Sequence, residues 1–372
     1  MTVGSRTVDA RIGIVHERFT ELGGSEAVVE HLAALSRDVE VFVPIADPAV
    51  RPGRLAGVPV RTSWLQHLYA GGEGYAHLLP LLPLAMRTAD LSGVDVVVTS
   101  HHAFANRVRP PEGVPVVSYT HTPARWMWRA DMRAGEAGPA GRAVLGAFAA
   151  TQRRADRLAA ARAHTVVANS YAVADRVREW WGREAVVVAP PVEVERFTPG
   201  TGPREPFFLL AGRLVPYKQP QVAVEAARRA GVRLVVAGDG RARAECERLA
   251  GPGTTFLGRV SEAELRELFR TCRALVFPGV EDFGIVPVEA QACGAPVVAL
   301  GAGGALDTVR PGETGVLVDP AADPVEGFAA ALARFTPLDP AAARRNAERF
   351  SVDAFRERMT AVVEGALARS TV

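Results

Sequence analysis

Residues 274–294 read ALVFPGVEDFGIVPVEAQACG, and this stretch sets the interpretation of the whole chain. Its first four residues are apolar and predict a buried strand, which turns through Gly279 into a short helix that ends near Gly294. The first amides of a helix are unpaired and lie at the positive end of its dipole, so they favour a phosphate. Glu281 precedes this helix and Glu289 lies within it, where carboxylates suit sugar hydroxyls. The stretch indicates a phosphate-and-sugar site, although an ordinary strand–helix turn with solvent-facing acids gives the same pattern.

Composition indicates a soluble globular protein of two or three domains. The chain has 372 residues, of which 48% are hydrophobic and 23% charged. A net charge of +2 without any Lys/Arg-rich run argues against nucleic-acid binding. The three cysteines form no CxxC pair, so neither a disulfide framework nor a zinc site is expected, and a reducing cytoplasm fits.

No segment of the sequence predicts membrane insertion. Residues 1–10 are polar and contain no apolar core of a signal peptide. The longest apolar block, residues 78–86, is too short and too rich in proline to span a bilayer. We therefore expect a cytoplasmic protein that works in solution or in peripheral contact with the inner face of a membrane.

Strand and helix patterns alternate along both halves of the chain, which predicts α/β domains with doubly wound parallel sheets. The segment 189–203 is rich in Pro and Gly and reads as a linker. We therefore expect an N-terminal domain over 1–198, a C-terminal domain over 199–349, and a last helix over 350–372 that rejoins the first domain. The predicted strands are 11–16, 39–43, 95–100, 114–119, 165–170 and 185–188, then 207–212, 233–238, 255–258, 274–277, 296–300 and 315–318.

Two segments of the first half are candidates for ligand binding. Gly23 and Gly24 precede a predicted helix over 25–35 with Ser25 as its N-cap, and paired glycines let a ligand approach the backbone. His121 follows a strand end, where ligand crevices of open α/β sheets lie. A tight loop without a ligand and a buried histidine bonded to backbone explain the same residues. Trp126 and Trp128 suit either stacking on a sugar ring or core packing. His101 and His102 also follow a strand but lack a third metal ligand.

The loop after the first strand of the second half carries two cations, Arg213 and Lys218. Lys218 is the only lysine of the chain, which indicates that this position needs a compact ammonium rather than the planar guanidinium of arginine. Two cations beside a helix N-terminus would neutralise a diphosphate and hold it as a leaving group. Surface solvation is the alternative.

Taken together, these motifs resemble the retaining glycosyltransferases of family 4. The resemblance rests on the Gly23–Gly24 loop, the Gly212–Lys218 loop and the E-x7-E spacing from Glu281 to Glu289. It implies the GT-B fold, in which two Rossmann-like domains with parallel sheets face a central cleft. Within the family, the stretch 281–292 and His121-Thr122-Pro123 are most similar to bacterial mannosyltransferases that use GDP-mannose.

The resemblance also implies residue roles. Glu289 would bind the nucleotide ribose and Glu281 the donor sugar, while the diphosphate would lie against Arg213 and Lys218, with Gly24 closing from the other domain. His121 would lie beside the sugar near the reacting carbon. Further donor contacts implied in this way are Gly23, Arg259, Val260, Asp282, Phe283, Gly284, Ile285 and Val286.

The implied reaction is transfer of a hexose from a nucleotide-diphosphate sugar to a hydroxyl, with retention of anomeric configuration, no cofactor and no metal, since no DxD motif is evident. The acceptor would be a glycan, a lipid-linked molecule or a small natural product. Segments 64–86 and 121–133 would contact it, through residues such as Trp64, Tyr75, Trp126 and Trp128.

Other functions fit parts of the pattern. A UDP-, ADP- or dTDP-sugar could replace GDP-mannose, and a sugar-nucleotide 2-epimerase shares the GT-B architecture. An NAD-dependent oxidoreductase finds support only in Gly301-Ala302-Gly303-Gly304, which lacks the full G-x-G-x-x-G fingerprint. A non-catalytic sugar-nucleotide-binding protein would not need Arg213, Lys218 and Glu281 together.

Overall fold

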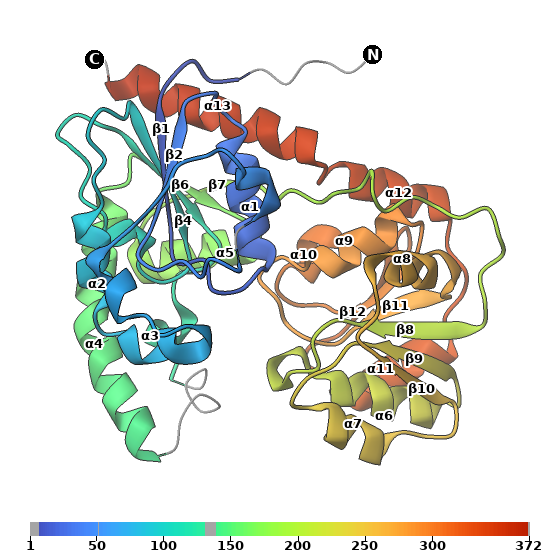
Figure 1. Cartoon of the computed structure of the whole chain (residues 1–372). Helices are drawn as coiled ribbons and strands as arrows, with labels where there is room; N and C mark the ends of the chain where they lie inside the picture. Colours follow the sequence, from blue (N-terminus) through green and yellow to red (C-terminus); the bar gives the residue numbers. More distant parts are fainter. Residues whose placement is uncertain (1–6, 51, 131–138, 371–372) are drawn as a thin grey trace. The chain divides into compact units, whose positions relative to one another are not determined.

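The computed structural model describes residues 7–50, 52–130 and 139–370. Residues 1–6 of the polar N-terminus and 131–133 of the predicted acceptor segment therefore lie outside the described residues. The chain divides into two compact units, one formed by residues 1–191 with 353–372 and the other by residues 192–352 (Figure 1).

The first unit is built on a parallel sheet of seven strands in the order β3-β2-β1-β4-β5-β6-β7. Both faces of the sheet are covered, so β1, β2, β4 and β5 are buried throughout and read as apolar runs. The strands are β1 (Ile12–His16), β2 (Val39–Val43), β3 (Val60–Thr62), β4 (Val96–His101), β5 (Val116–Thr120), β6 (Thr165–Ala168) and β7 (Val186–Val187).

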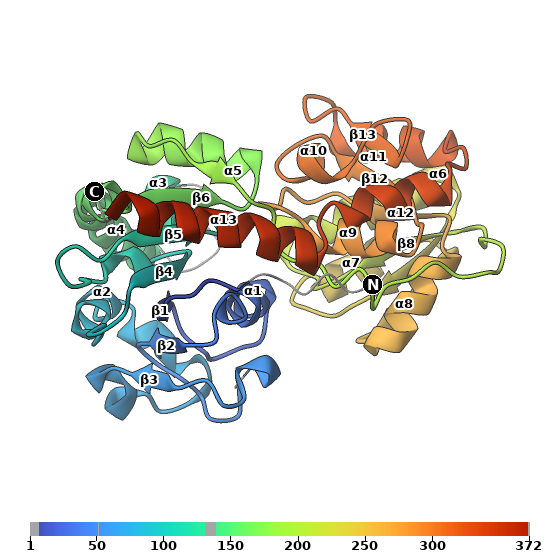
Figure 2. The same cartoon turned by 90° about the horizontal axis from the view of Figure 1, so that it is seen from above.

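Helices pack on both faces of this sheet. Side chains of β1 alternate between two apolar clusters, with Ile14 in one and Val15 in the other. The C-terminal helix α13 (Val352–Ser370) joins the cluster of Ile14 through Phe355, Met359 and Val363 (Figure 2). The other α-helices are α1 (Gly24–Ala33), α2 (Leu82–Ala85), α3 (Arg125–Trp128), α4 (Pro139–Ala161) and α5 (Tyr171–Arg176).

The second unit repeats this plan with six parallel strands in the order β10-β9-β8-β11-β12-β13. They are β8 (Phe207–Ala211), β9 (Arg233–Ala237), β10 (Thr254–Gly258), β11 (Ala274–Phe277), β12 (Val297–Leu300) and β13 (Gly315–Val318). Its helices are α6 (Pro220–Ala230), α7 (Arg243–Leu249), α8 (Glu262–Thr271), α9 (Ile285–Ala292), α10 (Ala305–Thr308), α11 (Pro324–Ala333) and α12 (Pro340–Glu348).

The strand order places one topological switch point in each sheet, where ligands of open α/β folds bind. In the first unit it lies between β1 and β4, whose last residues include His16 and His101. In the second unit it lies between β8 and β11, and the loops after these two strands carry Lys218 and Glu281.

The predicted fold class of two Rossmann-like parallel-sheet domains is confirmed, with two local corrections. Ser25 is not an N-cap, because α1 begins at Gly24 with Gly23 as its cap, and the side chain of Glu26 accepts the Gly23 amide at 2.9 Å instead. The short strand β3 was not predicted. No helix in the described part of the chain is long and apolar enough to cross a membrane.

Candidate functional site

The second unit presents a cationic loop at its switch point. After β8 the chain passes Arg213 and makes a single 3₁₀ turn, Pro216–Lys218 (η8). Gln219 then takes a φ of 50°, the only positive φ of a non-glycine residue in the described ranges. Such a conformation costs energy and is common at functional loops. Here it turns the chain into α6, whose first residue is Pro220.

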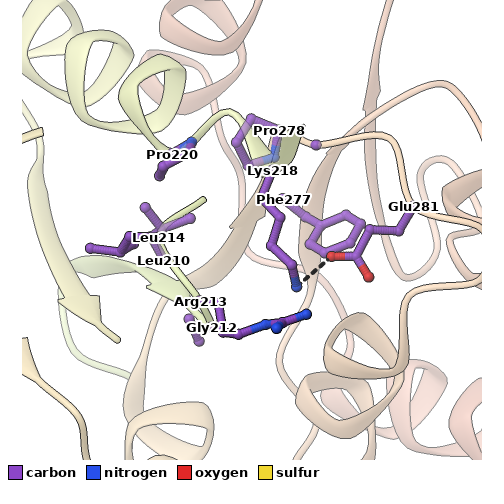
Figure 3. Close-up of a pocket in the computed structure, with 11 residues that line it drawn as sticks. Leu210, Gly212, Arg213, Leu214, Lys218, Pro220, Phe277, Pro278 and Glu281 are labelled. Atoms are coloured by element: carbon purple, nitrogen blue, oxygen red, sulfur yellow. Dashed lines mark ion pairs between the residues drawn. The ribbon is translucent and has the colours of Figure 1, made fainter. Parts of the chain in front are cut away.

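Lys218 and Glu281 meet across the switch point. The Lys218 ammonium lies 2.6 Å from Glu281 Oε1, and the two side chains are 19% and 21% exposed. Figure 3 shows the guanidinium of Arg213 beside this pair, directed toward the same space. The three residues border an open hollow, whose other walls are Leu210, Ala211, Gly212, Leu214, Pro220, Phe277, Pro278 and Gly279.

Two glycines let the backbones around this hollow approach closely. A Cβ at Gly279 would lie 2.7 Å from the Lys218 Cα. A Cβ at Gly304 would lie 2.1 Å from the Phe283 carbonyl oxygen, and the Gly304 amide donates to the Glu281 carbonyl at 2.9 Å. The glycine run 301–304 therefore supports the loop that carries Glu281. This packing role accounts for the pattern that suggested a dinucleotide.

The start of α9 offers backbone donors beside this loop. Gly284 caps the helix with a φ of 88°, a conformation that favours glycine. The amides of Ile285 and Val286 open the first turn, where a helix provides no acceptor of its own. Pro287 has no N–H to offer. At the other end of α9, Gln291 is buried and accepts from Asn346 at 2.7 Å, which anchors the helix to α12.

Glu289 lies near the start of α8, the helix that follows the predicted base contacts Arg259 and Val260. Burial, together with repulsion from Glu262, raises the pKa of Glu289 from 4.5 to about 7, with Arg196 opposing the shift. Arg196 itself pairs with Glu262 at 2.7 Å. A partly buried carboxyl can accept hydrogen bonds from the hydroxyl groups of a ligand. The structure thus puts Glu289 at the β10–α8 side of α9, whereas Glu281 faces Lys218.

In the first unit, the structure links the glycine loop to His121. Glu26 accepts the Gly23 amide with one carboxylate oxygen and contacts His16 Nε2 at 3.1 Å with the other. His16 Nδ1 lies 3.0 Å from the Ser100 hydroxyl, which lies 2.8 Å from His121 Nε2. Sequence reasoning gave no role to His16, Glu26 or Ser100. Polar side chains at the ends of buried strands were the available signal.

A second buried acid, Glu17, also went unnoticed in the sequence. Its carboxylate accepts the amides of four consecutive residues after β4 (His102, Ala103, Phe104 and Ala105) at 2.8–3.1 Å. Glu17 Oε1 also lies 3.7 Å from His101 Nδ1. Burial lowers the pKa of His101, His102 and His121 to about 3, so these rings are neutral at neutral pH. Glu17 therefore fixes the loop that carries His102.

The four side chains predicted to contact the acceptor differ in how closely other protein groups pack against them. Trp64 is 39% exposed, and the guanidinium carbon of Arg18 lies 4.2 Å above the Tyr75 ring. Trp126 stacks on Phe148 with ring centroids 6.0 Å apart. The Trp128 indole donates to Asp156 at 3.0 Å and its ring stacks on Trp180. Core packing, the alternative left open by the sequence, thus describes the two α3 tryptophans.

Within the residues that the structure describes, no group of three or more His, Cys, Asp or Glu could hold a metal ion. His101 Nδ1 accepts the Asn106 amide at 3.3 Å, and the His102 ring lies edge-on to the rings of His16 and His121.

Two family models match the chain, one on each unit. The model of glycosyltransferase family 4 matches residues 22–196, and that of glycosyl transferases group 1 matches residues 192–349. A D-inositol 3-phosphate glycosyltransferase of Acidothermus cellulolyticus is 33% identical over 361 residues, covering 84% of this chain and 76% of the relative. The chain belongs to the family 4 glycosyltransferases.

Further relatives agree with this assignment. The D-inositol 3-phosphate glycosyltransferase of Geodermatophilus obscurus is 34% identical, covering 74% of this chain and 68% of its own. These relatives share one name, so the similarity is not specific to GDP-mannose-dependent mannosyltransferases. The chain is therefore a glycosyltransferase.

Solved structures share the fold. Sucrose-phosphate synthase of Thermosynechococcus elongatus superposes with a TM-score of 0.72 at 20% identity, covering 96% of this chain and all of that one. HepE of Anabaena in complex with UDP gives a TM-score of 0.68 at 19% identity, with 95% and 100% coverage.

Proposed function

We propose that this glycosyltransferase moves a hexose from a nucleotide-diphosphate sugar to an acceptor hydroxyl with retention of anomeric configuration. The observation that carries the proposal is the meeting of Arg213, Lys218 and Glu281 at the switch point of the second sheet. Two cations and the amides of α9 suit a diphosphate, and a carboxylate beside them suits a sugar hydroxyl.

In the proposed reaction, the bond between the anomeric carbon and the β-phosphate oxygen breaks, and the electron pair leaves with the diphosphate. Arg213 and Lys218 stabilise the charge that develops there. The acceptor oxygen bonds to the anomeric carbon from the leaving-group face, and a phosphate oxygen takes its proton. No metal is required by this scheme. His121 is proposed to lie beside the donor sugar.

Glu289 is the proposed ribose ligand. Its neighbour Glu262 follows soon after Arg259 and Val260 in the sequence. The proposed base and ribose contacts would therefore come from adjacent segments. A carboxylate accepts hydrogen bonds from two hydroxyls, as a ribose presents.

Two donor classes are to be compared directly. The motif resemblance of residues 281–292 favours GDP-mannose, whereas the UDP complex of the structurally similar HepE favours a UDP-sugar. For the acceptor, the relatives' shared name favours an inositol phosphate. A lipid-linked or glycan hydroxyl is the next class to test.

The experiment combines the purified full-length protein with GDP-mannose or UDP-glucose and D-inositol 3-phosphate. We expect a glycosylated product with the donor's anomeric configuration, read from proton couplings by NMR. Donor without acceptor should give at most slow hydrolysis. Turnover of donor alone to an epimer would replace the proposal by a 2-epimerase, and tight nucleotide binding without any turnover would indicate a binding protein.

A further inference from the structure

A continuous chain of hydrogen bonds runs through the first unit from the glycine loop to His121. It passes from the Gly23 amide to Glu26 (2.9 Å), from Glu26 to His16 (3.1 Å), from His16 to Ser100 (3.0 Å) and from Ser100 to His121 (2.8 Å). Its two ends are the two parts of this unit for which donor contacts are predicted.

The three inner members of this hydrogen-bond chain are buried, and the sheet fixes two of them. His16 and Ser100 are fully buried, and Glu26 is 6% exposed. His16 and Ser100 are directly opposite each other in the parallel register of β1 and β4. Removing the hydrogen-bond partner of a buried polar group costs free energy, so the position of each residue depends on its neighbour in the hydrogen-bond chain. The mechanism proposed above uses none of the three inner residues.

The number of hydrogens available in this hydrogen-bond chain restricts which atom donates in each bond. Burial alone would raise the pKa of Glu26, but its bonds with His16, its own backbone and Ser25 lower it to about 2. Glu26 is therefore an ionised acceptor, and His16 Nε2 must donate to it. If His16 is neutral, Ser100 donates to its Nδ1 and His121 Nε2 must donate to Ser100. If His16 is charged, Ser100 is free to donate to His121 Nε2.

We propose that Glu26, His16 and Ser100 are positioning residues that fix the tautomer of His121, with the charge of His16 deciding which ring nitrogen of His121 carries hydrogen. The outer nitrogen, Nδ1, then accepts a hydrogen bond from a sugar hydroxyl when His16 is neutral and donates one when His16 is charged. This inference rests on the proposed function only for the identity of that sugar partner.

Other titratable and charged groups lie near His16 and His121. His102 lies 6.1 Å from His16 and 6.4 Å from His121 between ring centroids, and Tyr119 lies 5.2 Å from His121. Burial lowers the pKa of His102 and His121 to about 3 and raises that of Tyr119. These rings stay neutral near pH 7. Glu17 acts electrostatically on His121, and Arg18 acts on His102.

The first test does not depend on catalysis. In full-length protein labelled with ¹⁵N-histidine, ring nitrogen shifts report the tautomer, and His121→Gln assigns the signal. We expect a single tautomer of His121, with the hydrogen on Nε2 where the ring shifts show His16 neutral and on Nδ1 where they show His16 charged. In Ser100→Ala, His121 should populate both tautomers independently of His16. An unchanged His121 signal in Ser100→Ala would overturn the proposal.

The second test uses glycosyl transfer with a matched control. Ser118 is as buried as Ser100, and its hydroxyl donates to Asn106 at 2.9 Å and lies 3.1 Å from the Thr120 hydroxyl, whereas the Ser100 hydroxyl contacts His121. Ser100→Ala should lower kcat roughly tenfold and flatten its pH profile. Ser118→Ala should keep the wild-type profile, and Ser100→Thr should restore part of the loss. Equal profiles for the two alanine variants would overturn the role in transfer. If the wild type transfers no sugar, the proposed function fails while the NMR result still decides the relay.

Discussion

The ammonium of Lys218 lies 2.6 Å from the carboxylate of Glu281, which joins the loops after β8 and β11 by an ion pair. In the free protein each charge is therefore partly neutralised by the other. Under the proposed function, an entering diphosphate would compete with Glu281 for Lys218, and binding of the donor would release a carboxylate to face the sugar.

Lys218→Ala should lower kcat roughly 100-fold or more while the protein stays folded, because a charge that stabilises the leaving diphosphate is lost. Arg310→Ala is the matched control, since it removes one positive charge from an exposed pair with Glu313 in the same unit. Initial rates at saturating donor, with circular dichroism for folding, measure both. Wild-type turnover in Lys218→Ala would remove the diphosphate role from this residue.

Glu281→Gln should separate binding of the nucleotide from transfer of the sugar. Lys218 loses its competing partner, so affinity for a free nucleoside diphosphate should rise by roughly three- to tenfold, the size of a partly exposed ion pair. The kcat should fall, because the carboxylate no longer contacts the sugar. Calorimetry with UDP or GDP gives the first value and transfer assays give the second. A weaker nucleoside diphosphate complex would contradict the competition.

Gly279→Ala should impair activity through backbone displacement alone. The new methyl would lie within 2.7–3.0 Å of the Lys218 Cα and carbonyl, so the loop must shift away from Glu281. We expect a fall in donor affinity of about tenfold, the scale of one strong contact. Gly202→Ala is the control, because nothing lies within 4 Å of its Cβ position. Equal donor affinity in the two variants would argue against a precise fit between these loops.

The raised pKa of Glu289, about 7 against 4.5, predicts a pH-dependent stability. The folded protein holds this proton more tightly than the unfolded chain, so stability falls as pH rises through the window from 4.5 to 7. Glu289→Gln should therefore be more stable than wild type at pH 8, by roughly 1–3 kcal/mol, and the difference should vanish near pH 4.5. Urea unfolding at both pH values measures it, with Glu357→Gln as an exposed control. A difference that persists at pH 4.5 would point to another cause.

Much of the fold could be predicted because the strands are covered on both faces. Val96, Val97 and Val98 form an apolar run that only a buried strand explains, and the same holds for Ala274–Phe277. The strand Val60–Thr62 escaped because it is three residues long, lies at the sheet edge and is partly exposed. Ser25 misled because Glu26 reaches back to the Gly23 amide in its place.

The candidate site was only partly visible in the sequence. Loops after strands indicated Arg213, Lys218 and Glu281 one by one, but their meeting depends on β8 lying next to β11, which chain order alone does not fix. The bond between His16 and Ser100 depends in the same way on the pairing of β1 with β4. Such contacts arise from strand order and register, which no local pattern encodes.

The most direct test of the central claim is calorimetric binding of a nucleoside and its diphosphate to wild type and to Arg213→Met/Lys218→Met. We predict that the diphosphate binds wild type at least about tenfold more tightly than the nucleoside, and that this gain disappears in the double variant while nucleoside affinity is kept. A diphosphate gain of equal size in both proteins would contradict the account.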